Sequence, residues 1–550
     1  MFPVIIFLIA YLFKVVVVGQ SFYAGDTESY LRIATNDGVI LFTFILLAIA
    51  VRNLSLPWSL LAKGTMFLIF LLYVVDAFII YWFKTRLYIS DYDKYASDIH
   101  LAMSGMGWQY YAFLLFLFGL FYRFMMSKGV KVGRQVAVLL VVTMGSLMVV
   151  SNAKPNSVRN VFYVNLFKVN INDGYRERYS DSFIAGLSYE PTVLCKPSKV
   201  ITPEKILIVV IESWSNYHSQ YFGGEENWTP HLDELASQNV ALKRFYANGF
   251  STEDGLYSML MGEPMLANSP IGKLNGINDL SLLENQRQSL IEELNDKGYA
   301  THFITSGSLD FVNKATWLTN IGFSKLIDQA DFSQDLERYL FSSVNDEILF
   351  ERAYDEISVL NGKQFVVVEN VTTHAPFVVP VDGESVISEE RAFNYTDKYA
   401  ARFIEKAKDD NWMIIVVSDH RAMTQLTDLE KRTEGIMASS RVPAFLVWND
   451  IQFELDTTMQ QSDLLSGLVN AMDGRSCYGD LQSAYIPIEQ AKSAECIVHK
   501  RGDDRALISL KCEGHNVNVQ LSGDDTRQVE GVEMPLAVNI VNYLRVRQMH

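Results

Sequence analysis

The sequence predicts an α/β protein in two parts: an N-terminal bundle of about five transmembrane helices, then a layered domain with a mostly parallel sheet. Two observations predict this division. Residues 1–150 hold long uncharged apolar runs, whereas from about residue 195 charged residues recur as in a soluble domain. In the second part, continuous apolar segments of strand length alternate with helical segments, which is typical of strands buried on both faces.

Five apolar stretches predict the membrane anchor, each near the roughly 20 residues that a spanning helix requires. The first lacks a basic start and a small-residue cleavage site, so we interpret it as an anchor rather than a cleaved signal. The second and the fifth are the weakest candidates. In order, the stretches are Pro3–Gly19, Ile33–Val51, Thr65–Phe83, Gly107–Tyr122 and Val136–Val150.

Charges in the loops predict the orientation, because cytoplasmic loops collect lysine and arginine. The second and fourth loops are basic, with Arg52, Lys63, Arg123, Lys128, Lys131 and Arg134. The first and third loops are mainly acidic, with Asp26, Glu28, Asp37, Asp91, Asp93 and Asp98. We therefore expect a multi-pass protein of the inner (cytoplasmic) membrane, with the residues after 150 outside the cytoplasm. Asp76 lies inside an apolar stretch, and we interpret it as paired within the bundle.

Net charge and cysteine content limit which partners the protein can have and which compartment it can occupy. The formal charge of −16 provides no basic stripe for phosphates, which excludes a nucleic-acid role. An exterior compartment permits disulfides, and the four cysteines allow three pairings. Cys477–Cys496 is a plausible bridge, with free thiols as the alternative.

Composition divides the chain into four regions. We predict a transmembrane anchor at 1–151, a linker at 152–200, a catalytic domain at 201–475 and a small C-terminal extension at 476–550. The extension contains short alternating segments, Ala506–Lys511 and Asn516–Leu521, which predict a β-rich fold.

Strands and helices alternate through the catalytic domain. Two helices are predicted at Thr229–Ala236 and Ser289–Lys297. Functional groups of such folds collect at the carboxyl ends of the strands. The predicted strands are Ile206–Ile211, Ala300–Thr305, Phe365–Val368, Met413–Val417 and Ala444–Val447.

Three of these strands end abruptly in polar residues. The first is followed by Glu212, the third by Glu369 and then His374, and the fourth by Ser418 and the pair Asp419-His420. A carboxylate after a strand often only caps the next helix. Carboxylates and an imidazole delivered together are instead the ligands of a divalent cation.

A hydroxyl nucleophile for such a site is predicted in the segment Tyr246–Leu256, which contains Ser251 and Thr252. These hydroxyls precede the amphipathic segment Leu256–Met261, and the positive end of a helix favours an alkoxide and a bound phosphate. An ordinary helix N-cap followed by an acidic first turn is the alternative interpretation.

Four segments together resemble the lipoteichoic acid synthase and phosphoglycerol transferase family, in the sulfatase-like branch of the alkaline phosphatase superfamily. No single motif carries the resemblance; their order and spacing do. The segments are Val209–Ser215, Thr229–Ala236, Phe245–Gly249 with Thr252, and Val417–His420.

By position, the resemblance makes Glu212, Thr252, Asp419 and His420 ligands of one metal ion, with Thr252 also the nucleophile. Ser251 remains the alternative nucleophile. The expected metal is Mn²⁺, with Zn²⁺ and Mg²⁺ as alternatives. His374 matches the histidine that binds the phosphate or protonates the leaving group.

Substrate contacts in the family fall near Ser306–Lys314, which points to Asn313 and Lys314. This chain lacks the aromatic residue and the arginine of the synthases there, which leaves the head-group specificity open. Arg421 either supplies that positive charge or is a solvated side chain. The segments Arg441–Pro443 and Ser462–Leu465 are interpreted as structural.

The resemblance implies a membrane-bound transferase that moves a phosphoglycerol-type group from a phosphatidylglycerol-like lipid to an acceptor hydroxyl. A phosphothreonine intermediate is expected, with a glycan or glycerol-phosphate chain as acceptor. The rivals are a sulfatase, a phosphoethanolamine transferase and an inactive binding or sensor module. The segment Ser251–Gly255 lacks the Cys/Ser-x-Pro-x-Arg context of sulfatases, which disfavours the first rival.

Overall fold

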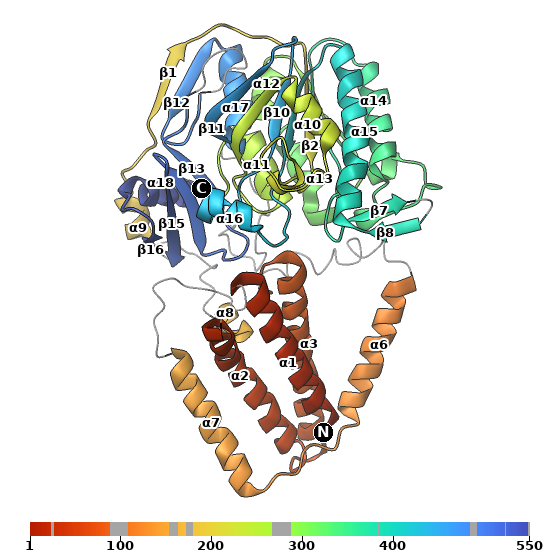
Figure 1. Ribbon diagram of the computed structural model, residues 1–550, viewed down its shortest axis with the longest axis vertical. Helices are drawn as coiled ribbons and strands as arrows, with labels where there is room; N and C mark the ends of the chain where they lie inside the picture. The colour runs from red at the N-terminus through yellow and green to blue at the C-terminus, as the bar shows by residue number, and fades with distance from the viewer. Residues whose placement is uncertain are drawn as a thin grey trace. The chain divides into compact units, whose positions relative to one another are not determined.

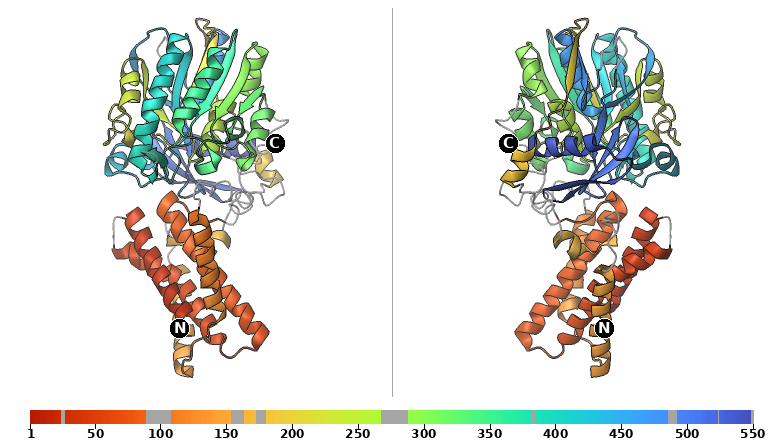
Figure 2. Two further views of the ribbon diagram at one scale, coloured as in Figure 1. Left: turned by 90° about the vertical axis from the view of Figure 1, so that its right-hand side faces the viewer. Right: turned by 90° about the vertical axis from the view of Figure 1, so that its left-hand side faces the viewer.

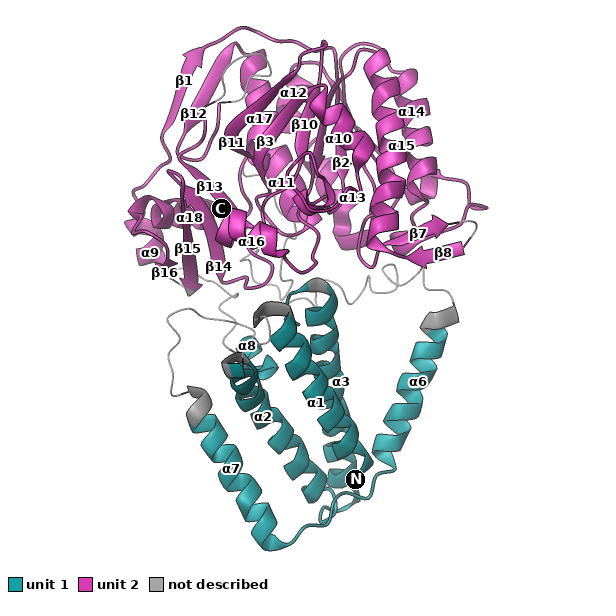
Figure 3. Ribbon diagram, viewed as in Figure 1, with its two compact units in different colours: residues 1–89, 106–173 teal, residues 90–105, 174–550 magenta. Residues whose placement is uncertain are grey.

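The computed structural model describes residues 1–23, 27–88, 108–152, 163–171, 180–266, 288–381, 384–484, 492–522 and 524–547. These residues form two compact units (Figure 3). The described residues up to 171 make the first unit, and those from 180 onward make the second.

All five predicted apolar stretches are helical in the first unit (Figure 1). Three helices are long and apolar enough to cross a membrane, and the other two contain shorter apolar segments, Tyr111–Met125 and Arg134–Val149. The second stretch is stronger than predicted because its helix begins at Thr27, well before Ile33. The helices are α1 (Phe2–Tyr23), α2 (Thr27–Ala50), α3 (Leu56–Phe83), α6 (Trp108–Met125), α7 (Arg134–Asn152) and the short α8 (Leu166–Ile171).

Five of the charges used for the orientation lie in helices rather than in loops: Glu28, Asp37, Lys63, Arg123 and Arg134. Asp37 lies inside α2, where its Oδ2 is 3.1 Å from Lys14 Nζ, and Lys63 lies inside α3. The loop prediction was therefore wrong for these five residues, because the helices extend beyond their apolar cores. Asp26, Asp91, Asp93 and Asp98 lie outside the described residues, so the orientation stays a prediction.

Asp76 is fully buried in the first unit and has two cationic partners. Its Oδ2 lies 2.7 Å from Lys14 Nζ and 2.9 Å from an Arg86 guanidinium nitrogen. This residue is paired within the bundle, as the sequence predicted.

A sheet of eight strands forms the centre of the second unit, in the order β11-β3-β10-β9-β2-β6-β4-β5. Strand β10 runs antiparallel to both neighbours, and the other pairs in this sheet are parallel. All five predicted strands belong to it. The strands are β2 (Lys205–Ile211), β3 (Val240–Tyr246), β4 (Ala300–Thr305), β5 (Lys325–Ile327), β6 (Gln364–Glu369), β9 (Met413–Ser418), β10 (Ala444–Val447) and β11 (Phe453–Gln460).

Helices cover both faces of this sheet (Figure 2), which explains why its central strands are apolar without interruption. In β2, Ile206, Ile208 and Val210 face one core, and the alternate residues face the other. The first core includes α11 (Thr252–Met261), α12 (Leu290–Asp296), α13 (Lys314–Asn320) and α17 (Gln461–Met472). The second includes α10 (Pro230–Ser237), α14 (Asp346–Ser358) and α15 (Glu389–Asp409).

The C-terminal extension is a four-stranded antiparallel sheet backed by a helix. The β-rich prediction is confirmed, whereas the helix was not predicted. Its elements are β13 (Cys496–Lys500), β14 (Leu507–Cys512), β15 (His515–Ser522), β16 (Asp525–Glu530) and α18 (Pro535–Arg547). The unit also contains α9 (Asp181–Gly186), α16 (Asp428–Glu434) and the hairpin of β7 (Val378–Val381) with β8 (Glu384–Ile387).

Both disulfides join residues that face each other across antiparallel strands. Cys195 in β1 (Val193–Pro197) is bonded to Cys477 in β12 (Arg475–Gly479), and Cys496 is bonded to Cys512. The predicted Cys477–Cys496 bridge was wrong because strand pairing, which sequence spacing does not reveal, sets the partners. Strand β1 lies in the predicted linker, so this part of the linker belongs to the second unit.

Candidate metal and nucleophile site

Two neighbouring parallel strands bring the predicted metal ligands together. Glu212 follows β2, and Asp419 and His420 follow β9, which pairs with β2 so that Ile211 lies opposite Ser418. One ligand atom from each of the three residues lies within 4.8 Å of the others, and all three side chains are buried. The carboxyl end of the sheet therefore holds the cluster that the sequence predicted.

Thr252 is the first residue of α11, and its hydroxyl points at this cluster. Its Oγ1 donates to Glu212 Oε2 at 3.0 Å and lies 3.5 Å from His420 Nε2. Ser251 is instead the N-cap, and its Oγ accepts the amide of Asp254. A Cβ at Gly255 would meet the Asp419 carbonyl oxygen at 2.2 Å, so glycine lets the helix approach the cluster.

Ser213 links the two carboxylates and was not predicted. Its amide donates to Asp419 Oδ1 at 2.8 Å, and its Oγ donates to Glu212 Oε1 at 2.7 Å. The backbone of Ser213 has φ of 60°, a left-handed conformation that non-glycine residues rarely adopt. Such strain is typical of functional sites, where it is maintained by the surrounding contacts.

A second chain of hydrogen bonds fixes Glu212 from behind. The Glu212 amide donates to Asn370 Oδ1 at 2.7 Å, and Asn370 Nδ2 donates to Asp346 Oδ2 at 2.8 Å. Asp346 also accepts from the hydroxyls of Thr372 and Thr396, and burial raises the pKa of this carboxyl. The sequence analysis missed both supporting residues, although Asn370 lies two positions after a predicted strand.

The three clustered groups shift one another's pKa values strongly. Burial, and then the neighbouring Glu212 carboxylate, raises the pKa of Asp419 well above its usual range. Burial opposes the charge on His420, yet Asp419 and Glu212 raise its pKa to about 10. Burial likewise opposes ionisation of Glu212, but the imidazolium of His420 holds its pKa well below normal. The cluster therefore binds protons tightly when no other cation is present.

A divalent cation suits this donor set. Two carboxylates, one imidazole and one hydroxyl converge, and hard oxygen and imidazole ligands bind Mn²⁺, Zn²⁺ and Mg²⁺. Asp419 Oδ2 is buried and accepts no hydrogen bond from the described residues. Its nearest charged partner is His420 Nε2 at 3.4 Å, which Glu212 shares, so a divalent cation would offset the remaining cost of burying two carboxylates.

His374 lies on the loop after β6 and is half-buried. Its Nδ1 is 2.6 Å from the Ala375 carbonyl oxygen, and its ring meets Phe341 edge-on at 4.8 Å. An Nδ1–H that donates to this carbonyl leaves Nε2 free for substrate, since the two ring nitrogens take opposite roles.

Lys314 and Asn313 open helix α13. Lys314 forms a buried ion pair with Glu369, the last residue of β6, whereas Asn313 is exposed. The other carboxylate oxygen of Glu369 is buried and accepts no hydrogen bond from the described part of the chain. Burial raises the pKa of Glu369. The lysine's charge is thus matched by Glu369, a strand-end carboxylate to which the resemblance assigned no role.

Arg421 has neither of the two predicted roles. It is buried, its guanidinium pairs with Glu430 at 2.7 and 2.8 Å, and it also donates to the carbonyls of Ala422, Thr424 and Gln425. Its donors hold the loop after β9 in place, so it is neither solvated nor available to a substrate.

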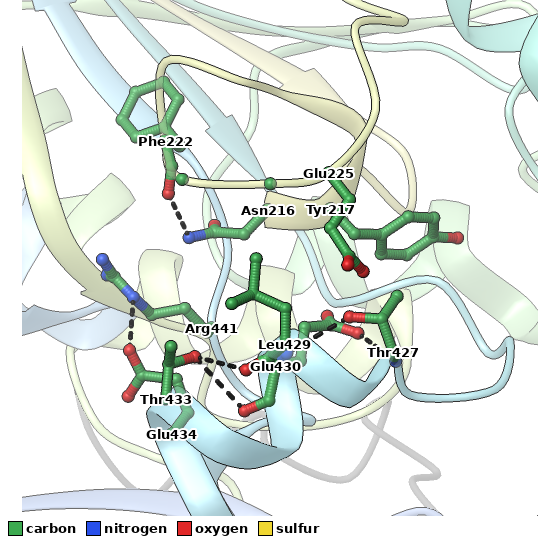
Figure 4. Close-up of a pocket in the computed structure, with 12 residues that line it drawn as sticks. Asn216, Tyr217, Phe222, Glu225, Thr427, Leu429, Glu430, Thr433, Glu434 and Arg441 are labelled. Carbon is green, nitrogen blue, oxygen red and sulfur yellow. Dashed lines mark hydrogen bonds and ion pairs between the residues drawn. The ribbon is translucent and has the colours of Figure 1, made fainter.

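A separate pocket lies between the loop after β2 and helix α16 (Figure 4). Its walls include Asn216, Tyr217, Thr427, Glu430 and Arg441. Glu430 in this wall is the partner of Arg421. None of the predicted site residues lines the pocket, so the functional argument rests on the metal cluster.

Comparison with known proteins gives a match to one family model and to distant relatives. The family model described as Sulfatase matches residues 204–474. Phosphoglycerol transferase I of Xanthomonas campestris is 24% identical over 218 residues, which are 35% of this chain and 30% of that protein. The same enzyme of Xanthomonas euvesicatoria is 24% identical over 215 residues, again 35% and 30%. The matches thus span less than a third of these relatives.

Solved structures are also similar to this chain. An alkaline phosphatase superfamily protein from Vibrio parahaemolyticus covers 67% of this chain and 96% of its own, with a TM-score of 0.51 and 19% identity. The lipoteichoic acid synthase LtaP of Listeria monocytogenes covers 69% and 96%, with a TM-score of 0.46 and 16% identity. The Vibrio structure supports the alkaline-phosphatase-like α/β fold that the sequence predicted.

Proposed function

We propose that the chain is a lipoteichoic acid synthase- and phosphoglycerol transferase-like protein of the alkaline phosphatase superfamily, and that it transfers a phosphoglycerol-type group from a phospholipid to an acceptor hydroxyl. The donor is a phosphatidylglycerol-like lipid, and the acceptor is a glycan or a glycerol-phosphate chain. The observation that carries the proposal is the hydroxyl of Thr252, hydrogen-bonded at 3.0 Å to Glu212 within the buried ligand cluster.

Glu212, Thr252, Asp419 and His420 would hold one divalent cation, Mn²⁺ by preference. When bound, the cation lowers the pKa of a coordinated hydroxyl and offsets charge on phosphoryl oxygens. Glu212 orients the Thr252 hydroxyl toward the cluster, and the positive end of α11 favours both the alkoxide and an incoming phosphate.

The proposed reaction is a double displacement. The Thr252 hydroxyl gives its proton to Glu212, and its oxygen forms a bond to phosphorus as the bond to the diacylglycerol oxygen breaks, which leaves a phosphoglyceryl-threonine. His374 supplies the proton that the diacylglycerol oxygen takes up. In the second half, the acceptor hydroxyl gives its proton to His374 and bonds to phosphorus, and the Thr252 oxygen leaves and takes its proton back from Glu212.

Glu369 favours a second candidate donor. Its buried carboxylate has an oxygen with no hydrogen bond among the described residues, and it matches the charge of Lys314. A carboxylate near the head group would suit the ammonium of phosphatidylethanolamine as well as the hydroxyls of glycerol. Phosphoethanolamine transfer is therefore the alternative reaction.

The proposed setting is the outer face of the inner membrane, with the second unit outside the cytoplasm. Two disulfides support this placement, since they persist in oxidising compartments. Three helices are candidate spans, and the proposed count of five includes α6 and α7.

The test uses the full chain in detergent with Mn²⁺ and lipid labelled in its head group, followed by mapping of the labelled residue by mass spectrometry. We expect head-group label on Thr252 from phosphatidylglycerol. Label from phosphatidylethanolamine alone would select the second candidate. Label on a residue other than Thr252 would contradict the assignment of the nucleophile.

A further inference from the structure

The C-terminal sheet binds the segment that leads to Thr252. Asn248 Nδ2 donates to the Val498 carbonyl, and the Lys500 amide donates to the Asn248 carbonyl, both at 2.8 Å. Between them, His499 Nδ1 lies 2.9 Å from the Ala247 carbonyl oxygen. Strand β13 thus runs along residues 247 and 248, shortly before the nucleophile helix begins.

From this strand, the side chain of Lys500 reaches the first turn of α11. Its Nζ lies 3.1 Å from Oδ1 of Asp254, and the two side chains are only 2% and 1% exposed. Asp254 is the third residue of the helix, and its amide donates to the N-cap Ser251. The ion pair therefore ends in the turn that begins with Thr252.

The same turn is confined on two further sides. A Cβ at Gly249 would lie 2.1 Å from the Asp254 Cβ, so the backbone before the helix lies directly against that side chain. Gly255, the next residue of the helix, lies against the Asp419 carbonyl, where a Cβ would be 2.2 Å from the oxygen. A shift of Asp254 would accordingly move the helix start relative to the ligand cluster.

We propose that Lys500 is a positioning residue for the nucleophile: it acts through Asp254 to hold the first turn of α11, and with it Thr252, against the ligand cluster. This inference rests on the proposed function for its catalytic meaning. It gives the C-terminal extension a role in the reaction, since the disulfide Cys496–Cys512 fixes the start of the strand that carries Lys500.

Stability alone is a weak reason for such a pair. Desolvation of two buried charges largely offsets their attraction, and apolar replacements of similar volume are often neutral or stabilising. Supporting residues around a metal site instead act on geometry, and their loss typically costs about 10- to 100-fold in metal affinity or activity. We expect an effect of that size from Lys500.

The experiment compares Lys500→Met, Asp254→Asn and the double variant in the full chain. Lys500→Met alone leaves a buried charge, whereas the double variant removes both charges and guards against misfolding. Ser509→Ala is the matched control, because it removes a buried 2.7 Å hydrogen bond to Asn518 within the same sheet but does not touch the turn. The measurements are the melting temperature, turnover of bis(4-nitrophenyl) phosphate with Mn²⁺, and amide hydrogen exchange of residues 248–256.

We expect Lys500→Met to lower kcat about 10- to 100-fold with KM unchanged and to speed amide exchange in that turn. The kcat of the double variant should be no lower than that of the worse single variant, because both residues act through one contact. Ser509→Ala should keep wild-type kcat despite a lower melting temperature.

Wild-type kcat in Lys500→Met, or an equal loss in Ser509→Ala, would overturn the proposal. If the wild type itself turns over no phosphodiester, the proposed function fails, and amide exchange decides the positioning role alone. Unchanged exchange at residues 248–256 in Lys500→Met would then overturn it.

Discussion

Two buried charge clusters, one in each unit, differ in how completely their charges are matched. In the first unit, Lys14 and Arg86 face Asp37 and Asp76, so two cations balance two carboxylates. We call this group the closed cluster. In the second unit, Glu212 and Asp419 share a single His420, and we call this group the open cluster.

The aspartates of the two clusters also differ in the hydrogen bonds that they accept. Asp76 accepts at both oxygens, from Arg86 at 3.0 and 2.9 Å and from the Leu87 amide at 3.0 Å. Asp419 Oδ2 accepts no hydrogen bond from the described residues. Lys14 Nζ of the closed cluster also makes no hydrogen bond within the described residues, so the contrast is one of charge. Two cations match two carboxylates in the closed cluster, whereas the open cluster leaves one carboxylate for a cation from solution.

The largest expected effect tests whether the open cluster performs chemistry. Thr252→Ala should lower kcat for phosphodiester cleavage by about 10⁴-fold or more, because the nucleophile is removed. Ser251→Ala should lower kcat far less, since the Ser251 hydroxyl caps the helix. Steady-state kinetics of the two variants measures the contrast, and equal losses would argue against Thr252 as the nucleophile.

The next effect concerns the closed cluster. Asp76→Asn leaves Lys14 and Arg86 short of one buried negative charge, and breaking a buried pair typically costs about 3–5 kcal/mol. The first unit should therefore unfold at a lower denaturant concentration. Mn²⁺ affinity should stay at the wild-type value, and a weakened affinity would contradict the separation of the two clusters.

The equivalent substitution in the open cluster should raise the free energy of unfolding of the metal-free protein instead of lowering it. Asp419→Asn removes a poorly satisfied buried carboxylate, so the metal-free protein should gain roughly 1–3 kcal/mol in free energy of unfolding. Stabilisation by added Mn²⁺ should vanish in the same variant. Thermal melts with EDTA and with Mn²⁺ provide both values. A metal-free Asp419→Asn protein that is less stable than the wild type would show that the cluster was already satisfied.

The smallest effect is a pH dependence of metal binding. The pKa of Asp419 is raised and that of His420 is raised to about 10, so both must lose protons to bind a cation. Mn²⁺ affinity should therefore rise with pH from 6 to 8, by up to roughly tenfold per unit for each proton released. Calorimetric titrations at three pH values measure this slope, and a flat profile would mean that the apo cluster holds no displaceable proton.

Sequence patterns predicted the parts of the fold that depend on local order. The strands Ala300–Thr305 and Ala444–Val447 are found with their predicted bounds. The second is apolar throughout, as expected of a strand that is buried on both faces. The grouping of Glu212 with Asp419 and His420 followed from the rule that parallel strands end at one edge.

Features set by contacts between distant segments were not predicted. The disulfide partners depend on which strands pair, and Ser213 becomes a link only through a left-handed backbone. Lys500 reaches Asp254 across 246 positions of sequence, a contact that no local pattern encodes. Arg421 follows a ligand in the sequence, yet its side chain turns to Glu430.

The central claim is that one cation joins Glu212, Thr252, Asp419 and His420. Anomalous diffraction from crystals of the full chain grown with Mn²⁺ tests it most directly, because it locates manganese independently of activity. We predict one manganese peak within coordination distance of all four side chains. A peak elsewhere, or no peak at the cluster at saturating Mn²⁺, would contradict the account.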